Sequence, residues 1–241
     1  MERDEALMTT RREKALALLD TFSRFTGYKH GLDNPYRRWL SGLDRLDRDA
    51  VRRFLCAWYP VSRHQPQILY LCMAAYPDWA DRRGLWENIG EEDGLMHPGD
   101  DPHYDLLEQL INKLGGSLVR DPEAEALASK FHDTLGLMTP AEATGVLAGV
   151  EHPALTISWY LHRIIELCGS SELLTTDPYL SIHVRVEPEH IIWAHGKGLQ
   201  YFESGEREAV VAAFRRVMTF WDEYWPLAFS RLDYPHYAHA A

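Results

Sequence analysis

The sequence has 241 residues, of which 46% are apolar and 25% are charged, and it includes eight Trp, twelve Tyr and eight Phe. This composition supplies ample apolar material for a buried core and excludes an intrinsically disordered chain. The formal net charge of −11 argues against a nucleic-acid-binding protein, because such proteins usually carry a basic patch or stripe.

Helix signals follow one another along the chain, and strand signals are nearly absent. Pro60 and Pro66 lie inside the longest predicted helix and are expected to kink or split it. Asn34 and Pro35 are read as part of a loop, and a capping box opens a helix at Thr139. The predicted helices span residues 4–26, 47–75, 78–93, 103–115, 121–135, 139–168, 178–202 and 206–230.

These elements predict an all-α, single-domain bundle of about seven or eight helices over residues 1–241, with frayed ends at 1–5 and 234–241. The N-terminal residues are charged and lack the apolar segment of a signal peptide. No apolar run reaches the roughly 18 residues that a membrane span needs. The three cysteines lie in apolar runs without metal-ligand spacing, which indicates reduced thiols. We therefore expect a cytoplasmic protein that does not bind membranes.

The clearest chemical motif is H-x-x-x-E-x-x-H, formed by His183, Glu187 and His190. Positions i, i+4 and i+7 lie on one face of a helix, so the two imidazoles and the carboxylate point the same way. This mixture of nitrogen and oxygen donors suits iron, although the same spacing also occurs in a solvated polar stripe. Apolar residues surround the motif on most sides, which favours a buried helix whose polar groups need partners.

Two further clusters carry acidic residues on other predicted helices. Glu151 stands on an otherwise apolar face, where a lone carboxylate needs either an arginine partner or a metal. Glu91 and Glu92 end a predicted helix and precede two histidines, His97 and His103. Acidic runs of this kind are most often solvated surface. In metal-binding helical bundles, however, carboxylates from separate helices meet histidines in the core.

Taken in chain order, these motifs resemble those of the haem-oxygenase-like di-iron oxidases and oxygenases, which share their fold with pyrroloquinoline-quinone synthase and thiaminase II. The resemblance extends from about Asp47 to Glu203. It includes the H-x-x-x-E-x-x-H helix, the segment Gly-Val-Glu-His that ends at His152, and N-x-x-E-E-x-G followed by H-x-x-L-L. The resemblance implies a haem-oxygenase-like fold and a site with two Fe(II) ions that uses O2 as cosubstrate. The implied metal ligands are Glu92, His103, Glu151, His183, Glu187 and His190, with His97 and Glu91 as alternates.

Several features depart from the family pattern. Glu187 replaces the usual Asp, and its side chain is longer by one methylene. Pro188 follows directly, so we expect the helix to be locally unwound there until metal binds. The loop before His103 is one residue longer than usual and contains His97, which therefore competes as a ligand. The second helix lacks the additional Glu of some members, which implies a second iron that is held weakly.

The resemblance also implies the class of reaction. Relatives oxidise amino acids and fatty acids, so we expect a biosynthetic oxidation of a small molecule, most simply an amino acid, by desaturation, C–C cleavage or N-oxygenation. A homodimer is a further expectation from the fold. A carboxylate substrate needs a cation, and an aromatic residue is a candidate for the pocket wall. The candidate substrate-binding residues are Arg63, Trp159, Arg163 and Lys197.

Two alternatives remain at this point. A metal-independent enzyme of the same fold would use His, Tyr or Cys in the same cavity, as quinone synthase or thiaminase II does. A non-catalytic ligand-binding protein would have no need of a ligand-like face aimed inward. Bound iron and O2 consumption distinguish both alternatives from a di-iron enzyme.

Overall fold

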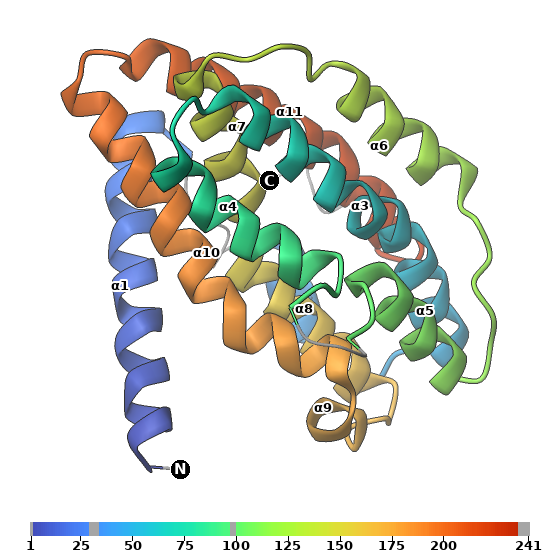
Figure 1. The fold of residues 1–241 in the computed structure, drawn as a ribbon. Helices are drawn as coiled ribbons and strands as arrows, with labels where there is room; N and C mark the ends of the chain where they lie inside the picture. The colour runs from blue at the N-terminus through green and yellow to red at the C-terminus, as the bar shows by residue number, and fades with distance from the viewer. Residues whose placement is uncertain (1, 29–33, 97–99, 236–241) are drawn as a thin grey trace.

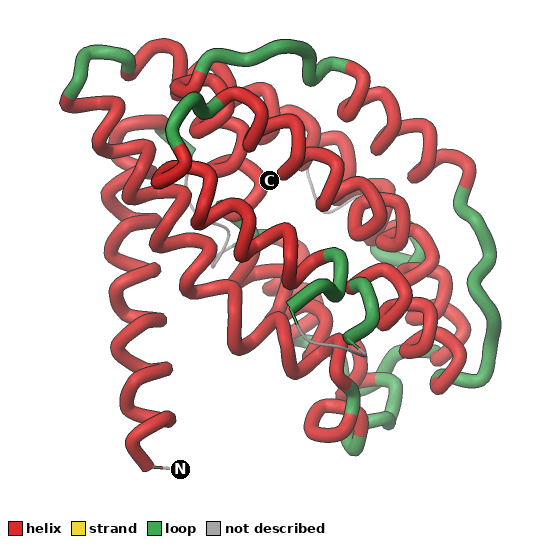
Figure 2. Tube along the Cα trace, in the orientation of Figure 1, coloured by secondary structure: helices red, strands yellow, loops and turns green. Residues whose placement is uncertain are grey.

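The computed structural model describes residues 2–28, 34–96 and 100–235, and side chains from residue 8 onward. Every regular element in these ranges is a helix, as the all-α prediction requires (Figure 2). None of the described helices combines the length and apolarity that a membrane span requires. The helices are α1 (Glu2–Thr26), α2 (Pro35–Ser41), α3 (Arg48–Ala75), α4 (Trp79–Glu92), α5 (His103–Lys113), α6 (Pro122–Asp133), α7 (Pro140–Glu151), α8 (Ala154–Leu167), α9 (Leu173–Thr176), α10 (Pro178–Glu203) and α11 (Arg207–Ser230).

The helix pattern differs from the prediction at three places. The helix predicted over 139–168 is two helices, because Pro153 lacks the amide hydrogen that would continue α7. The short helices α2 and α9 were not predicted. The signal for α2 is nevertheless present in the sequence, because the Asn34 side chain accepts a hydrogen bond from the amide of Arg37 and Pro35 occupies the first helical position. Of the ends predicted to fray, residues 2–5 belong to α1, and residues 236–241 lie outside the described ranges.

The prolines inside α3 and α10 disturb these helices less than expected. Helix α3 is continuous through Pro60 and Pro66, so of the predicted kink or split the split does not occur. Tyr224 of α11 donates its hydroxyl hydrogen to the carbonyl of Ala57, in the turn before Pro60. Helix α10 is likewise continuous through Pro188, where we expected local unwinding. Burial among neighbouring helices holds these segments helical against the local preference of proline.

Helix α10 runs through the length of the molecule, with α1 along its outer flank and α7 and α8 behind it (Figure 1). Helix α11 packs closely on α7. At Gly145 an added Cβ would lie 2.3 Å from the carbonyl oxygen of Val210, so only glycine permits this approach. One turn later, Trp221 of α11 donates its indole hydrogen to the carbonyl of Gly149 at 3.1 Å. The spacing of α7 and α11 is therefore set by small residues and fixed by a hydrogen bond.

Asp121 joins two distant parts of the chain and yields a stability prediction. It caps α6 through the amides of Glu123 and Ala124 and binds the guanidinium of Arg231 at 2.7 Å. We expect Asp121→Ala to lower the free energy of unfolding by about 1–3 kcal/mol, measured by chemical denaturation. Asp78 is the matched control, because it precedes α4 without a capping hydrogen bond and its replacement should change stability little.

The contribution of Asp121 should also depend on pH. Partial burial opposes ionisation, but the hydrogen bonds from Arg231 and the helix amides hold the pKa of Asp121 below its ordinary value of 3.8. A depressed carboxyl pKa stabilises the folded state above the ordinary pKa, and this stabilisation is lost as the pH falls through the folded-state value. The difference between wild type and Asp121→Ala should therefore be full at neutral pH and shrink in acid. A constant difference across that range would contradict the ion-pair explanation.

Candidate metal centre

Four helices bring the predicted ligands together in the interior. Glu92 is the last residue of α4, His103 is the first residue of α5, and Glu151 is the last residue of α7. The H-x-x-x-E-x-x-H motif lies in the middle of α10, so its side chains meet the ends of three other helices. All of these residues are at most 8% exposed, which excludes the solvated-stripe interpretation. The predicted ligands that the structure brings together are Glu92, His103, Glu151, His183, Glu187 and His190.

The turn after α4 places His103 beside Glu92. Gly94 has a φ of +64°, and a Cβ there would lie 2.5 Å from the carbonyl carbon of Asp101. Glycine therefore lets the backbone before α5 return against the end of α4. His97 lies outside the described residues, so its prediction as an alternate ligand stays untested.

Glu92, His103 and His183 form one half of the cluster. Nδ1 of His103 lies 3.0 Å from Oε2 of Glu92 without hydrogen-bond geometry, and the rings of His103 and His183 are centred 5.1 Å apart. Nδ1 of His183 lies 2.7 Å from the carbonyl oxygen of Tyr179, which directs its Nε2 away from the backbone. Burial opposes ionisation of Glu92, but the neighbouring His103 lowers the pKa of Glu92 overall.

Glu151, Glu187 and His190 form the other half. One ligand atom from each of these residues lies within 4.8 Å of those from the other two, so the longer Glu187 side chain still reaches the cluster. Asn88 donates its amide hydrogen to Glu151 at 3.3 Å, and Nε2 of His190 lies 2.8 Å from Glu91. In metal sites, carboxylates and amides that hydrogen-bond to a metal ligand orient that ligand and adjust its basicity. Asn88 contacts Glu151 in this way, and Glu91 contacts His190.

The pKa values of the residues in this half are shifted by burial and by the charges of their neighbours. Burial, followed by repulsion from Glu151, raises the pKa of Glu187 well above its ordinary value, and burial raises that of Glu151 as well. Burial disfavours the charged form of His190, but Glu91 and the two buried carboxylates together raise its pKa to about 10. Burial also lowers the pKa of His183 to about 4. A cation placed among these groups would relieve the carboxylate repulsion.

A small cavity of about 40 Å³ adjoins both halves. Glu92, Glu151, His183 and Glu187 line it together with mostly apolar groups. A space of this size admits a molecule such as O2, whereas a larger substrate requires side chains of the wall to move. The other lining residues are Trp58, Val61, Ser62, Gln65, Val150, Ala154, Ile157, Tyr179 and Trp221.

None of the four predicted substrate-binding residues lines this cavity. Arg63 pairs with Glu125 of α6, and Lys197 pairs with Asp81 of α4. Arg163 binds the carbonyl oxygens of Leu40 and Leu43 and pairs with Glu166. Trp159 lies under the guanidinium of Arg37. Spacing along a helix could not show that these side chains are engaged elsewhere.

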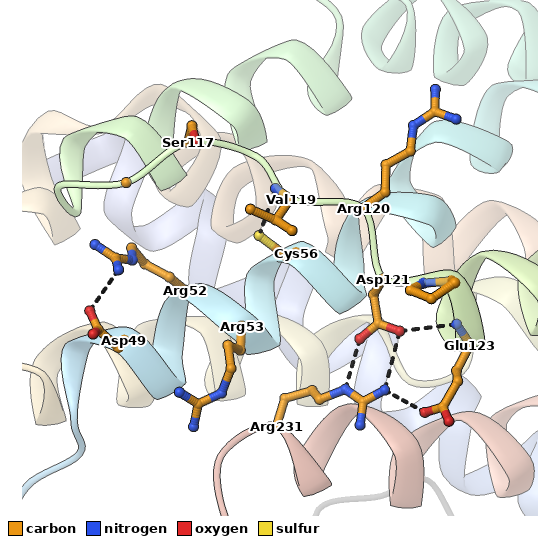
Figure 3. Close-up of a pocket in the computed structure, with 12 residues that line it drawn as sticks. Asp49, Arg52, Arg53, Cys56, Ser117, Val119, Arg120, Asp121, Glu123 and Arg231 are labelled. Carbon is orange, nitrogen blue, oxygen red and sulfur yellow. Dashed lines mark hydrogen bonds and ion pairs between the residues drawn. The ribbon is translucent and has the colours of Figure 1, made fainter.

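A much larger hollow of about 830 Å³ lies on the surface, and none of the predicted metal ligands lines it. It opens between α3, the segment before α6 and the end of α11 (Figure 3). Arg52 pairs there with Asp49, and Arg231 pairs with Asp121 and Glu123. The hollow contains no predicted ligand, so its size does not make it the functional site.

The donors around the small cavity fit a metal. Nε2 of His103 is buried and has no hydrogen-bond partner among the described residues. An imidazole nitrogen in this condition is costly unless something binds it. Three imidazoles and three carboxylates on four helices are also the donor set that iron takes in helical bundles. These buried donors are therefore suited to bind iron, which would take the place of the hydrogen-bond partner that His103 lacks among the described residues.

Comparisons with known proteins agree with this chemistry. The family model described as iron-containing redox enzyme matches residues 52–222. Among solved structures, a CADD-like protein of unknown function from Nostoc punctiforme has the same fold, with a TM-score of 0.70 and 16% identity. That match covers 91% of this chain and 99% of the other. No curated protein matches the sequence. The family match spans more than half of the chain and contains every ligand predicted above, so this protein belongs to the family of iron-containing redox enzymes.

Proposed function

We propose that the chain binds two Fe(II) ions and uses O2 to oxidise a small organic molecule. The observation that carries this proposal is the pair of adjoining clusters of buried donors at one small cavity. Glu92, His103 and His183 would hold one ion, and Glu151, Glu187 and His190 would hold the other. When bound, the ions supply the one- and two-electron chemistry of O2, which protein side chains cannot provide.

The side chains around the centre have separable tasks. Asn88 and Glu91 hold Glu151 and His190 from outside the cluster. Trp58, Val150, Ile157 and their neighbours exclude bulk water from the cavity, which protects reactive species from side reactions. Ser62 and Gln65 are the uncharged polar groups of the wall and are suited to orient a substrate by hydrogen bonding.

The substrate class follows from the wall of the cavity. No Arg or Lys of the described residues lines it, so a substrate carboxylate would find no cation there. The part of the substrate that faces the centre is therefore apolar in this proposal. An amino acid satisfies this requirement only if its side chain, and not its carboxylate, points inward.

The proposal is tested by loading the protein with Fe(II) without oxygen and then adding O2. We expect close to two irons per chain by elemental analysis and O2 consumption that accelerates with one member of a panel of amino acids and fatty acids. The mass of the product then separates desaturation, C–C cleavage and N-oxygenation. A chain that binds no iron under these conditions would instead support the metal-independent alternative.

Asn88 gives a prediction about the support of the centre. Because its amide holds Glu151, we expect Asn88→Ala to weaken iron binding by about 10–100-fold while leaving the fold intact. The measurement is a titration with Fe(II) under nitrogen, followed by the absorbance of a competing chelator. Asn112→Ala is the control, because Asn112 is exposed on α5. Equal affinities of the two variants would show that Asn88 does not position a ligand.

A further inference from the structure

A continuous set of aromatic side chains links the candidate metal centre to the surface. The Tyr179 ring is centred 4.4 Å from the imidazole of His183, and the indole of Trp58 donates its hydrogen to the Tyr179 hydroxyl at 2.8 Å. Trp58 also lies nearly parallel to Trp225, with ring centres 5.8 Å apart and 7° between the planes. Trp221 stacks on both indoles, at 6.0 Å from Trp58 and 5.1 Å from Trp225.

The outer end of this set is accessible. Trp225 is half-buried and lines a surface hollow of about 440 Å³ with Trp221 and Asp222. At the inner end, Tyr179 is fully buried and lines the cavity beside Glu92, His183 and Glu187. The chain of rings therefore begins where a solute can reach and ends where the metal ligands are.

The hydrogen bonds distinguish Tyr179 from the other tyrosines near these indoles. Tyr224 donates its hydrogen to the backbone carbonyl of Ala57, and Tyr160 donates to the side-chain oxygen of Asn34. Neither acceptor leads toward the metal ligands. Tyr179 instead accepts the indole hydrogen of Trp58 and itself lines the cavity of the metal ligands. Of these three phenols, Tyr179 alone borders the cavity into which its proton would leave.

We propose that Tyr179, Trp58, Trp221 and Trp225 form an electron-transfer path between the surface hollow and the metal centre. This inference rests on the proposed function, because O2 at the centre is its terminal oxidant. The external reductant would be a small thiol or an ascorbate-like molecule in the hollow. The path supplies single electrons to the centre during turnover. When no substrate is bound, the same electrons reduce a centre that O2 has oxidised.

Each transfer conserves both electrons and protons. Tyr179 loses one electron to the centre, its O–H bond breaks, and the proton passes into the cavity that Tyr179 lines. Trp58 then supplies an electron to Tyr179, whose proton returns, and Trp225 in turn restores Trp58. The reductant restores Trp225, is itself oxidised by one electron and releases its proton to solvent. The protein is unchanged, and one electron has moved from the reductant to the centre.

The path is tested first without metal. Azide radicals generated by pulse radiolysis oxidise tryptophan, and the later appearance of tyrosyl radical is followed by its own absorption band. We expect Tyr179→Phe and Trp58→Phe to lower the yield of tyrosyl radical at least twofold. Tyr76→Phe is the matched control, because Tyr76 is also fully buried and bonds Thr144 outside the path. Equal yields in wild type and in all three variants would overturn the proposal.

A second arm uses the iron-loaded protein exposed to O2 without substrate. Peptide mass spectrometry should find oxidation products at Trp225 and Trp221, reduced at least twofold in Tyr179→Phe. Products spread equally over exposed Trp79 and Trp86 would contradict a directed path. Tyr179→Phe keeps the ring, so it decides the question if Trp58→Phe fails to fold. A wild type that binds no iron would overturn the proposed function and remove the acceptor at the end of the path, whereas the radiolysis, carried out without metal, tests the coupling between the rings separately.

Discussion

Glu151→Gln is expected to reduce the iron content from two ions per chain to one or none and to slow O2 consumption by at least about 100-fold. Glu151 lies at the end of α7 within the cluster of Glu187 and His190, and a neutral amide there removes a negative oxygen donor. Outer partners of metal ligands already contribute about 10–100-fold, so the loss of a ligand should reach at least the upper end of that range. Elemental analysis and an oxygen electrode provide the two measurements.

Glu166→Gln is the control for this variant. Glu166 is an exposed carboxylate on α8 that pairs with Arg163, and its replacement changes the net charge equally. We expect it to retain full iron content and activity. If Glu151→Gln also kept two irons per chain, the assignment of the second metal position would be wrong.

Glu187→Gln should have opposite effects on the metal-free and the iron-loaded protein. Without metal, burial and repulsion from Glu151 raise the pKa of Glu187, so its ionisation opposes folding. A neutral side chain of the same shape should therefore stabilise the metal-free protein by about 1–3 kcal/mol at neutral pH. With Fe(II), wild type should gain stability because the metal binds the folded state, and the variant should gain much less.

The pH dependence gives an independent check of that prediction. A carboxyl group whose folded-state pKa is raised stabilises the fold below its ordinary pKa, and the stabilisation is lost as the pH rises through the folded-state value. Metal-free wild type should thus lose stability as the pH rises above about 4.5, the ordinary value for Glu, and Glu187→Gln should lose less. Glu189→Gln on the same helix is the control, because Glu189 is half exposed and pairs with Arg11. Parallel curves for wild type and Glu187→Gln would contradict the repulsion.

The sequence was most informative where chemistry and helix period coincide. One helix face carries His183, Glu187 and His190, and their inward direction follows from spacing and from their apolar neighbours. The sequence assigned Glu92 and Glu151 to the site only through the family resemblance, from the order of the motifs along the chain. The structure shows that both side chains are buried at the same cavity. Asn88 could have been found, because it lies four residues before Glu92 on the same helix face.

Other features depend on contacts that no local pattern encodes. The continuity of α3 across Pro60 accompanies the burial of this proline among helices that lie far along the chain. The ion pairs that remove Arg63 and Lys197 from the site depend on Glu125 and Asp81 of other helices. The break between α7 and α8 is predictable from Pro153, because a proline lacks the amide hydrogen that would continue a helix, even inside an apolar run.

The close approach of α7 and α11 has a consequence for how this protein could change its substrate. Trp221 forms part of the cavity wall, yet its position depends on the glycines of α7 that set the distance to α11. A methyl group at Gly145 would push against the backbone at Val210, about three helical turns away from Trp221. Selection acting on the contact between these two helices therefore has a way to remodel the cavity beside the candidate metal centre without replacing any side chain that lines it.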